Sequence, residues 1–174
     1  MPPILNSKRM KLRPPSEADQ ENIYRLGSSV VVMKHINGGI PQNREEAKLD
    51  LQKRLKTSSM PLGYWIAETI DTGEFIGWMC LKQLDESPHI ELGYRFLEDF
   101  WGKGLATEGS FTILNYAFHT LKIEEVVAVA REDNRASTRV MEKVGMEKKG
   151  YDNFYGVECV VYILNRDNYL KTIT

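Results

Sequence analysis

The sequence has little cysteine, no long apolar run and almost no net charge. Its 174 residues include two cysteines, 23 basic and 24 acidic side chains, so the formal charge is 23 − 24 = −1. Because there is no basic excess, binding to nucleic acid is not expected, and any bound anion must be held by local geometry. No run approaches the roughly 18 uncharged apolar residues of a membrane span, so no membrane partner is expected.

The cysteines also lack the spacing of a metal or redox site. Cys80 and Cys159 lie far apart, each inside an apolar run, and the three histidines share no metal-ligand spacing with them. We therefore expect two reduced thiols in the core and no metal site. Residues 1–6 lack the apolar segment of a signal peptide, which predicts a cytoplasmic protein.

Glycine and proline are scattered rather than gathered into linkers. With no internal repeat, low-complexity tract or Gly/Ser-rich stretch to divide it, the chain is predicted to form one domain over residues 1–174. A domain of this length buries roughly 70% of its unfolded surface, so it has room for a full core.

The order of the predicted elements is mixed. Helices are expected to start at Ser16 and Asn43, to span 104–121, and to run from Asn134 to Gly145, with an irregular segment over 28–42. Strands are expected over 10–13, 63–69, 74–84, 89–96, 125–130, 150–155 and 158–164. The strand–helix–strand unit of 89–130 predicts a local parallel pair, and the hairpins predict antiparallel ones. The predicted fold is therefore α+β, a mixed and mostly antiparallel sheet with helices on both faces.

The most informative segment is the turn that joins the strand near residue 96 to the helix near residue 105. Gly102 and Gly104 let the chain turn sharply and let a ligand approach the backbone. The first amides of the following helix lack partners within the helix, which suits them to phosphate. Neither nucleotide pattern fits, because the third glycine of GxGxxG is missing and Ser110 replaces the P-loop lysine. A purely structural turn remains the alternative.

Five motifs between residues 10 and 146 give this turn a context. They are Met10–Arg13 with Ser16–Asp19, Phe75–Trp78, Ile90–Tyr94, Trp101–Glu108 and Asn134–Met146. Together they resemble the GNAT superfamily of acyl-CoA-dependent N-acetyltransferases, and most closely its ribosomal-protein N-terminal (RimJ/RimL-type) branch. The resemblance implies a GNAT-like sheet whose central strand pair splays apart, with Gly93 expected to mark the opening.

The resemblance also implies a co-substrate, acetyl-CoA, and the residues that hold it. The resemblance implies that the pyrophosphate is bound by the turn residues Trp101, Gly102, Lys103, Gly104, Leu105, Ala106 and Thr107. It also implies that the pantetheine arm pairs with the backbone of Arg95, Phe96 and Leu97 at the splayed strand edge. Asn134 and Ser137 are implied near the arm, and Lys143 near the ribose 3′-phosphate, although Asn134 also suits a plain helix cap.

Two residues carry the catalytic roles that the resemblance implies. Glu91 matches the family glutamate that deprotonates the amine through water, with a solvated strand carboxylate as the alternative. Ser137 matches the serine proposed to protonate the departing thiolate, with a cap-region serine as the alternative. Many GNAT enzymes use a tyrosine seven residues after the asparagine, but here that position is Met141, which cannot donate a proton.

The acceptor is predicted less directly. Segments 28–42 and 150–157 contain one carboxylate, Asp152, whereas a polycationic acceptor would need an acidic pocket. This favours a protein or peptide N-terminus, whose α-amine is about one quarter neutral at pH 7.4. A small amine such as a polyamine or aminoglycoside is an alternative acceptor. A non-catalytic acyl-CoA sensor is an alternative of another class, and homodimerisation is left open.

Overall fold

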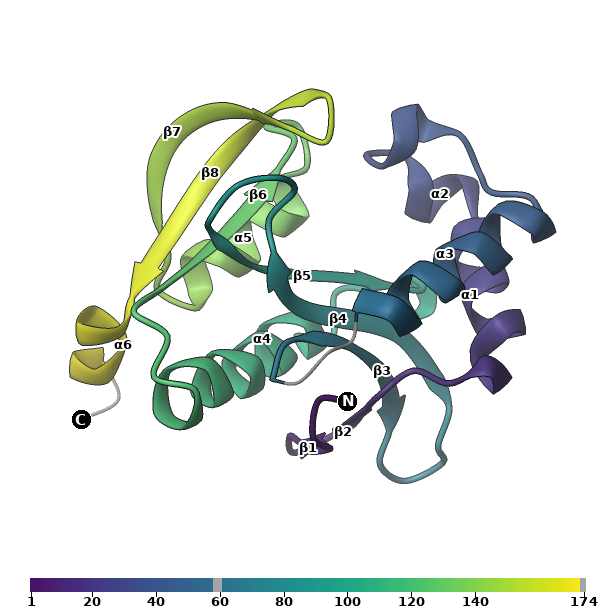
Figure 1. Cartoon of the computed structure of the whole chain (residues 1–174), viewed down its shortest axis with the longest axis horizontal. Coiled ribbons are helices and arrows are strands. Elements are labelled where there is room, and N and C mark those ends of the chain that lie inside the picture. Colours follow the sequence, from purple (N-terminus) through teal and green to yellow (C-terminus); the bar gives the residue numbers. More distant parts are fainter. Residues whose placement is uncertain (58–60, 173–174) are drawn as a thin grey trace. The chain divides into compact units, whose positions relative to one another are not determined.

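The computed structural model describes residues 1–57 and 61–172 (Figure 1). Its contacts group the chain into two compact units, which we describe separately. The first unit comprises Met1–Cys80 and Tyr94–Ala106, and the second comprises Leu81–Gly93 and Thr107–Thr174. In the described residues, no helix has the length and apolar character needed to cross a bilayer.

The first unit combines three α-helices with the first strands of the sheet. In chain order its elements are β1 (Leu5–Asn6), β2 (Met10–Arg13), the 3₁₀ turn η1 (Glu17–Asp19), α1 (Gln20–Gly27), α2 (Val30–Met33), the 3₁₀ turn η2 (Asn37–Gly39), α3 (Arg44–Thr57), β3 (Gly63–Thr69) and the start of β4 (Phe75–Gln83). The end of β5 (Ile90–Phe96) and the 3₁₀ turn η3 (Glu98–Phe100) complete it.

The second unit contains the remaining strands and helices. After the end of β4 and the start of β5 come α4 (Leu105–Asn115), the π-helical turn η4 (Tyr116–Thr120), β6 (Glu125–Ala130), α5 (Arg135–Lys143), β7 (Glu147–Phe154), β8 (Val157–Asn165) and α6 (Arg166–Thr172). The core of this unit includes Ile113, Leu114, Phe118 and Val126, all fully buried. The Phe118 and Tyr169 rings lie 5.0 Å apart, which ties α6 to the end of the long helix.

Hydrogen bonds join the strands in the order β1-β2-β3-β4-β5-β6-β8-β7. The β5–β6 pair is parallel, and β1–β2, β2–β3, β6–β8 and β7–β8 are antiparallel. This confirms the predicted mixed, mostly antiparallel sheet. Among the described residues, the β5–β6 register contains the pair Glu91–Val127, whereas β6 pairs with β8 at all six of its residues.

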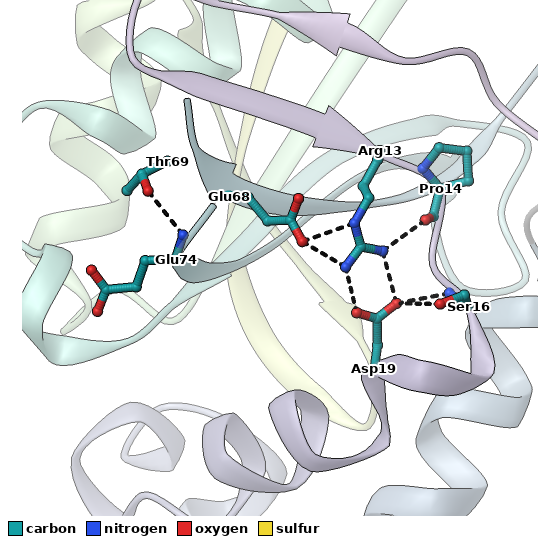
Figure 2. Close-up of polar contacts among 7 residues, drawn as sticks. All are labelled: Arg13, Pro14, Ser16, Asp19, Glu68, Thr69 and Glu74. Carbon is teal, nitrogen blue, oxygen red and sulfur yellow. Dashed lines mark hydrogen bonds and ion pairs between the residues drawn. The ribbon is translucent and has the colours of Figure 1, made fainter. Parts of the chain in front are cut away.

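Local sequence signals explain where the first helices begin. Ser16 and Asp19 form a capping box, and Asn43 and Glu46 form another, with each side chain accepting a hydrogen bond from the other residue's backbone N–H. The Asp19 carboxylate also accepts two hydrogen bonds from Arg13, at 2.7 and 2.9 Å, and Arg13 reaches Glu68 on β3 (Figure 2). One guanidinium therefore connects β2, β3 and the start of the helical segment.

Three features differ from the expected elements. The segment 28–42 is not wholly irregular, because Ser29 caps the short helix α2 through a hydrogen bond from the Val32 N–H. The helix expected over 104–121 leaves α-helical geometry after Asn115, and the Leu121 N–H bonds to the Tyr116 carbonyl five residues back. The strand β1 and the helix α6 were not expected at all.

Candidate functional site

The first candidate element is the turn that precedes α4, in the first unit. Gly102 and Gly104 have φ angles of +71° and +76°, a conformation in which a side chain is strained. A Cβ added at Gly102 would meet nothing within 4 Å, so this backbone borders open space. The indole N–H of Trp101 donates to the Phe96 carbonyl at 2.9 Å and fixes the start of the turn. The geometry suits a phosphate group, because exposed glycines allow close approach and helix-start amides donate to anions.

A residue that the sequence did not single out also holds this turn. Arg9, in the connection between β1 and β2, donates from Nη1 to the Lys103 carbonyl at 2.9 Å. Its Nη2 would lie 3.7 Å from a Cβ built at Gly104. A guanidinium therefore stands beside the backbone expected to bind pyrophosphate, 94 residues away in the sequence. No local pattern marks Arg9, since an arginine in a surface turn is ordinary.

The backbone groups at the end of β5 point in two directions, toward β4 and away from it. The Leu97 N–H donates to the Ile76 carbonyl of β4 at 2.9 Å, so this donor is used within the sheet. A Cβ at Gly77 would lie 2.1 Å from the Arg95 carbonyl oxygen, which shows how closely the strands approach there. Because backbone groups alternate along a strand, Arg95 and Leu97 direct theirs toward β4 and Phe96 directs its own to the opposite edge. Of the three residues predicted to bind the arm, Phe96 therefore directs its backbone groups away from β4.

Glu91 lies in the second unit, and its carboxylate is hydrogen-bonded to other side chains rather than solvated. Its residue is 8% exposed. The carboxylate accepts hydrogen bonds from Lys82 Nζ, at 2.8 Å, and from the Tyr155 hydroxyl. Lys82 Nζ and the Tyr155 hydroxyl are also 2.6 Å apart, so the three groups form a closed triangle. The alternative interpretation of Glu91 as a solvated strand acid is therefore wrong.

Two residues with strained backbone, Tyr155 and Asp85, lie at this triangle or next to it. Tyr155 and Asp85 are non-glycine residues with φ angles of +54° and +46°. The Tyr155 N–H donates to the Asp85 carboxylate at 2.9 Å, so the two strained residues hold each other. Strain of this kind persists where surrounding contacts impose it and is concentrated at functional sites. No local sequence pattern joins Tyr155 to Glu91 or Lys82, which lie 64 and 73 residues away in the sequence.

The residues expected on α5 lie near its start and its end. The Asn134 side-chain oxygen accepts the Ser137 N–H at 3.3 Å, so Asn134 is the N-cap. Met141 is buried at 7% exposure, and Lys143 is exposed in the last turn. Within the described residues, no hydrogen bond joins Ser137 to Glu91, Lys82 or Tyr155. The structure thus brings Asn134 and Ser137 together as predicted neighbours, separately from the Glu91 triangle.

Both cysteines are buried, as predicted. Burial raises the pKa of the Cys159 thiol above its usual value and is the largest effect; a backbone hydrogen bond at Phe154 lowers this pKa, and the charge of nearby Glu91 raises it. A thiol held protonated in this way is a poor nucleophile. Residues 1–57 and 61–172 contain no cluster of three His, Cys, Asp or Glu side chains that suits a metal ion.

The first unit also contains two arginines packed on aromatic rings. The guanidinium of Arg54, on α3, lies 4.5 Å from the Tyr64 ring centroid and 4.1 Å from that of Trp78. Arg95, on β5, lies 5.1 Å from the Trp78 ring on the same strand pair. Burial, and then the charge of Arg54, lowers the pKa of Arg95 to about 10. The resemblance assigned a role only to the backbone of Arg95, and the sequence did not predict this cluster.

Comparisons with known proteins agree with this geometry. Residues 9–147 match the model of the acetyltransferase (GNAT) domain family. An uncharacterized N-acetyltransferase, YoaA of Bacillus subtilis, is 30% identical over 150 residues, covering 85% of each chain. The FsC-acetyl coenzyme A-N(2)-transacetylase of Aspergillus fumigatus is 32% identical over 155 residues, covering 83% of this chain and 65% of that protein.

Solved structures show the same fold. An aminoglycoside acetyltransferase in complex with coenzyme A superposes with a TM-score of 0.80 at 18% identity, covering 95% of this chain and 99% of that one. At this identity the similarity concerns the fold alone. With the family match over most of the chain, the chain belongs to the GNAT family of acetyl-CoA-dependent N-acetyltransferases.

Proposed function

We propose that this N-acetyltransferase acetylates the N-terminal α-amino group of a protein or peptide, by direct attack of the amine on acetyl-CoA. The observation that carries the choice of acceptor is the positive charge of Arg54 and Arg95 in the first unit, which contains the segment 28–42 expected on the acceptor side. This charge repels a polycationic acceptor more strongly than it repels a peptide with a single amine. The RimJ/RimL-like resemblance points to the same class of acceptor.

The turn before α4 fits the pyrophosphate of acetyl-CoA. The backbone at Gly102 borders open space, and the amides at the start of α4, from Leu105 to Thr107, have no acceptor within the helix. The Phe96 N–H, on the edge of β5 that faces away from β4, is the donor we assign to the pantetheine arm. Lys143, exposed at the end of α5, is assigned to the 3′-phosphate. These assignments extend the family match to individual residues and are open to test.

The chemistry requires one proton to leave the amine and one to reach the sulfur. As the amine nitrogen forms its bond to the acetyl carbon, the carbon–sulfur bond breaks and a thiolate departs. We assign Glu91 as the acceptor of the amine proton through water, with the Tyr155 hydroxyl hydrogen-bonded to that carboxylate. We assign Ser137, in the first turn of α5, as the donor to the thiolate, which needs little help because a thiol has a pKa near 8.5.

The test is acetylation of a peptide array varied at its first two residues, with spermidine and an aminoglycoside in parallel. Thiol release on peptides and on neither small amine is the expected result. Release on the small amines alone would replace the acceptor class, and acetyl-CoA binding without release on any amine would favour a sensor. The phosphate assignment is tested separately with Gly104→Val, which should abolish acetyl-CoA binding in calorimetry while the protein stays folded.

A further inference from the structure

Arg95 is a buried cation whose surroundings in the first unit do not neutralise it. Its Nη1 donates to the Met33 sulfur at 3.5 Å, and its guanidinium faces the Trp78 ring. Its Nε is buried and makes no hydrogen bond. Among the described residues, no carboxylate lies within ion-pair distance of Arg95.

The carboxylate near Arg95 is that of Asp50, and it is paired with Arg54. Asp50, on α3, raises the pKa of Arg95 through its charge. Both Asp50 oxygens, however, accept hydrogen bonds from Arg54 Nη2, at 2.8 and 2.9 Å. Arg95 therefore lies beside a like charge whose counter-ion is already engaged. A buried charge without a paired and hydrogen-bonded partner is unfavourable, and proteins retain one chiefly where a ligand completes it.

The surroundings indicate which anion would complete this site. Arg95 is largely buried but not fully enclosed, because the residue as a whole is partly exposed. Its planar fork matches a carboxylate in two parallel hydrogen bonds. The Trp78 ring is flat and the Met33 thioether is weakly polar, which suits a planar carboxylate better than a strongly hydrated phosphate dianion.

We propose that Arg95 binds a carboxylate of the acceptor, so that acceptors with an acidic group near the reacting amine are preferred. The inference rests on the proposed transfer to an amine and names a chemical feature of that acceptor. The carboxylate belongs either to an Asp or Glu side chain near a peptide N-terminus or to a free amino acid. Both sources offer the same group to the guanidinium.

The experiment compares matched acids and amides. One arm uses peptides with Asp or Glu at one of the first five positions against the same peptides with Asn or Gln. A second arm uses free amino acids against their carboxamides. The wild type should show kcat/KM about 10- to 100-fold higher for acids in at least one arm, the size expected for hydrogen bonds to a charged partner. Equal values for acids and amides in both arms would overturn the proposal.

Variants separate binding from a structural role. Arg95→Gln should lower kcat/KM on the acids to about the value for the amides, so that the preference for acids disappears. Arg25→Gln removes an arginine that is 52% exposed in the same unit and should leave the preference intact. Equal losses on acids and amides in Arg95→Gln would show a structural role and contradict the proposal. If that variant does not fold, Arg95→Lys replaces it, because a lysine keeps the charge but not the fork and should reduce the preference.

Failure of the proposed function is distinguishable from failure of this inference. If no amine releases thiol, calorimetry measures binding of the acidic and amide peptides, and of the amino acids and their carboxamides, to the wild-type protein saturated with coenzyme A. Tighter binding of an acid over its amide, lost in Arg95→Gln, would support the carboxylate site even though the transfer proposal had failed. Equal binding within every pair would reject the site.

Discussion

At the scale of single residues, the structure changes what Glu91 has to do. Its carboxylate accepts hydrogen bonds from both Lys82 and Tyr155, which hold it in position. To take a proton from a water-bound amine it must weaken one of these bonds. Tyr155 is 52% exposed and is the most exposed of the three residues. Its hydrogen bond to Glu91 is therefore the one we expect to weaken. The proposed base, Glu91, is therefore one of three hydrogen-bonded groups, and sequence reasoning singled out Glu91 alone.

Glu91→Gln tests this cluster. The amide keeps the shape but cannot take a proton, so kcat/KM on a peptide should fall about 10²- to 10⁴-fold at neutral pH. The loss should shrink as the pH rises toward the pKa of the acceptor amine, because the neutral amine then arrives without help. Initial rates from pH 6 to 9 measure this, with Tyr155→Phe as the companion variant and a smaller loss expected. Full activity of Glu91→Gln at pH 7 would assign the base to another group.

Arg9 provides a second prediction at this scale. Its bond to the Lys103 carbonyl holds the turn, and its charge lies beside the backbone assigned to the pyrophosphate. Arg9→Gln should raise KM for acetyl-CoA about tenfold or more with little change in kcat, as expected for loss of a hydrogen bond to a charged group. S-acetylpantetheine lacks the pyrophosphate, so its kcat/KM should not change. An equal loss on both thioesters would show that Arg9 does not act at the phosphates.

At the scale of elements, predictions from local signals succeeded and those that needed distant contacts did not. Strands 10–13, 63–69 and 125–130 have the predicted bounds, because side-chain alternation and turn residues act over a few neighbours. The short helix α2 was hidden in a valine-rich segment, and valine favours strands by propensity alone. In the candidate site, Glu91, Asn134 and the glycine turn were found from sequence. Arg9 and the Arg95 cluster were not, since each depends on a chain segment more than 15 residues away.

The connection of β2 to the first helical segment makes stability sensitive to acid. Asp19 is 1% exposed, and burial alone would raise its pKa, but the hydrogen bonds from Arg13 and Ser16 outweigh burial and lower it (Figure 2). A carboxyl whose pKa is lower in the folded state stabilises the fold above its unfolded pKa of about 3.9. This contribution is lost as the pH falls through the folded value.

Asp19→Asn should therefore lower the free energy of unfolding at pH 7 by about 2–3 kcal/mol, the worth of hydrogen bonds to a charged partner. Below about pH 4 the difference between variant and wild type should narrow, because the wild-type carboxyl is itself becoming protonated. Urea denaturation at pH 7 and at pH 3 measures both values. Glu17→Gln, which changes an exposed acid in the same turn, is the control and should have little effect. A difference independent of pH would mean that the ionic contacts of Asp19 contribute nothing.

At the scale of the whole molecule, the arrangement of nucleophiles decides between two kinetic mechanisms. Transfer through an acyl-enzyme needs a reactive thiolate or an activated hydroxyl. Both cysteines are buried, and burial raises the pKa of Cys159, so neither is suited to attack a thioester. This agrees with the proposed direct attack of the amine on acetyl-CoA, which requires both substrates to be bound at once.

Initial velocities at varied acetyl-CoA and peptide should therefore give intersecting lines in double-reciprocal plots. Replacing Cys80 and Cys159 by alanine should leave kcat within about twofold of the wild type, because neither sulfur touches the reacting atoms. The substitutions remove buried atoms and cost stability, so a temperature at which all variants are folded is used for the comparison. Parallel lines, or an acetyl group trapped on either cysteine after quenching, would contradict direct transfer and would require a covalent step that the folded chain is not built to support.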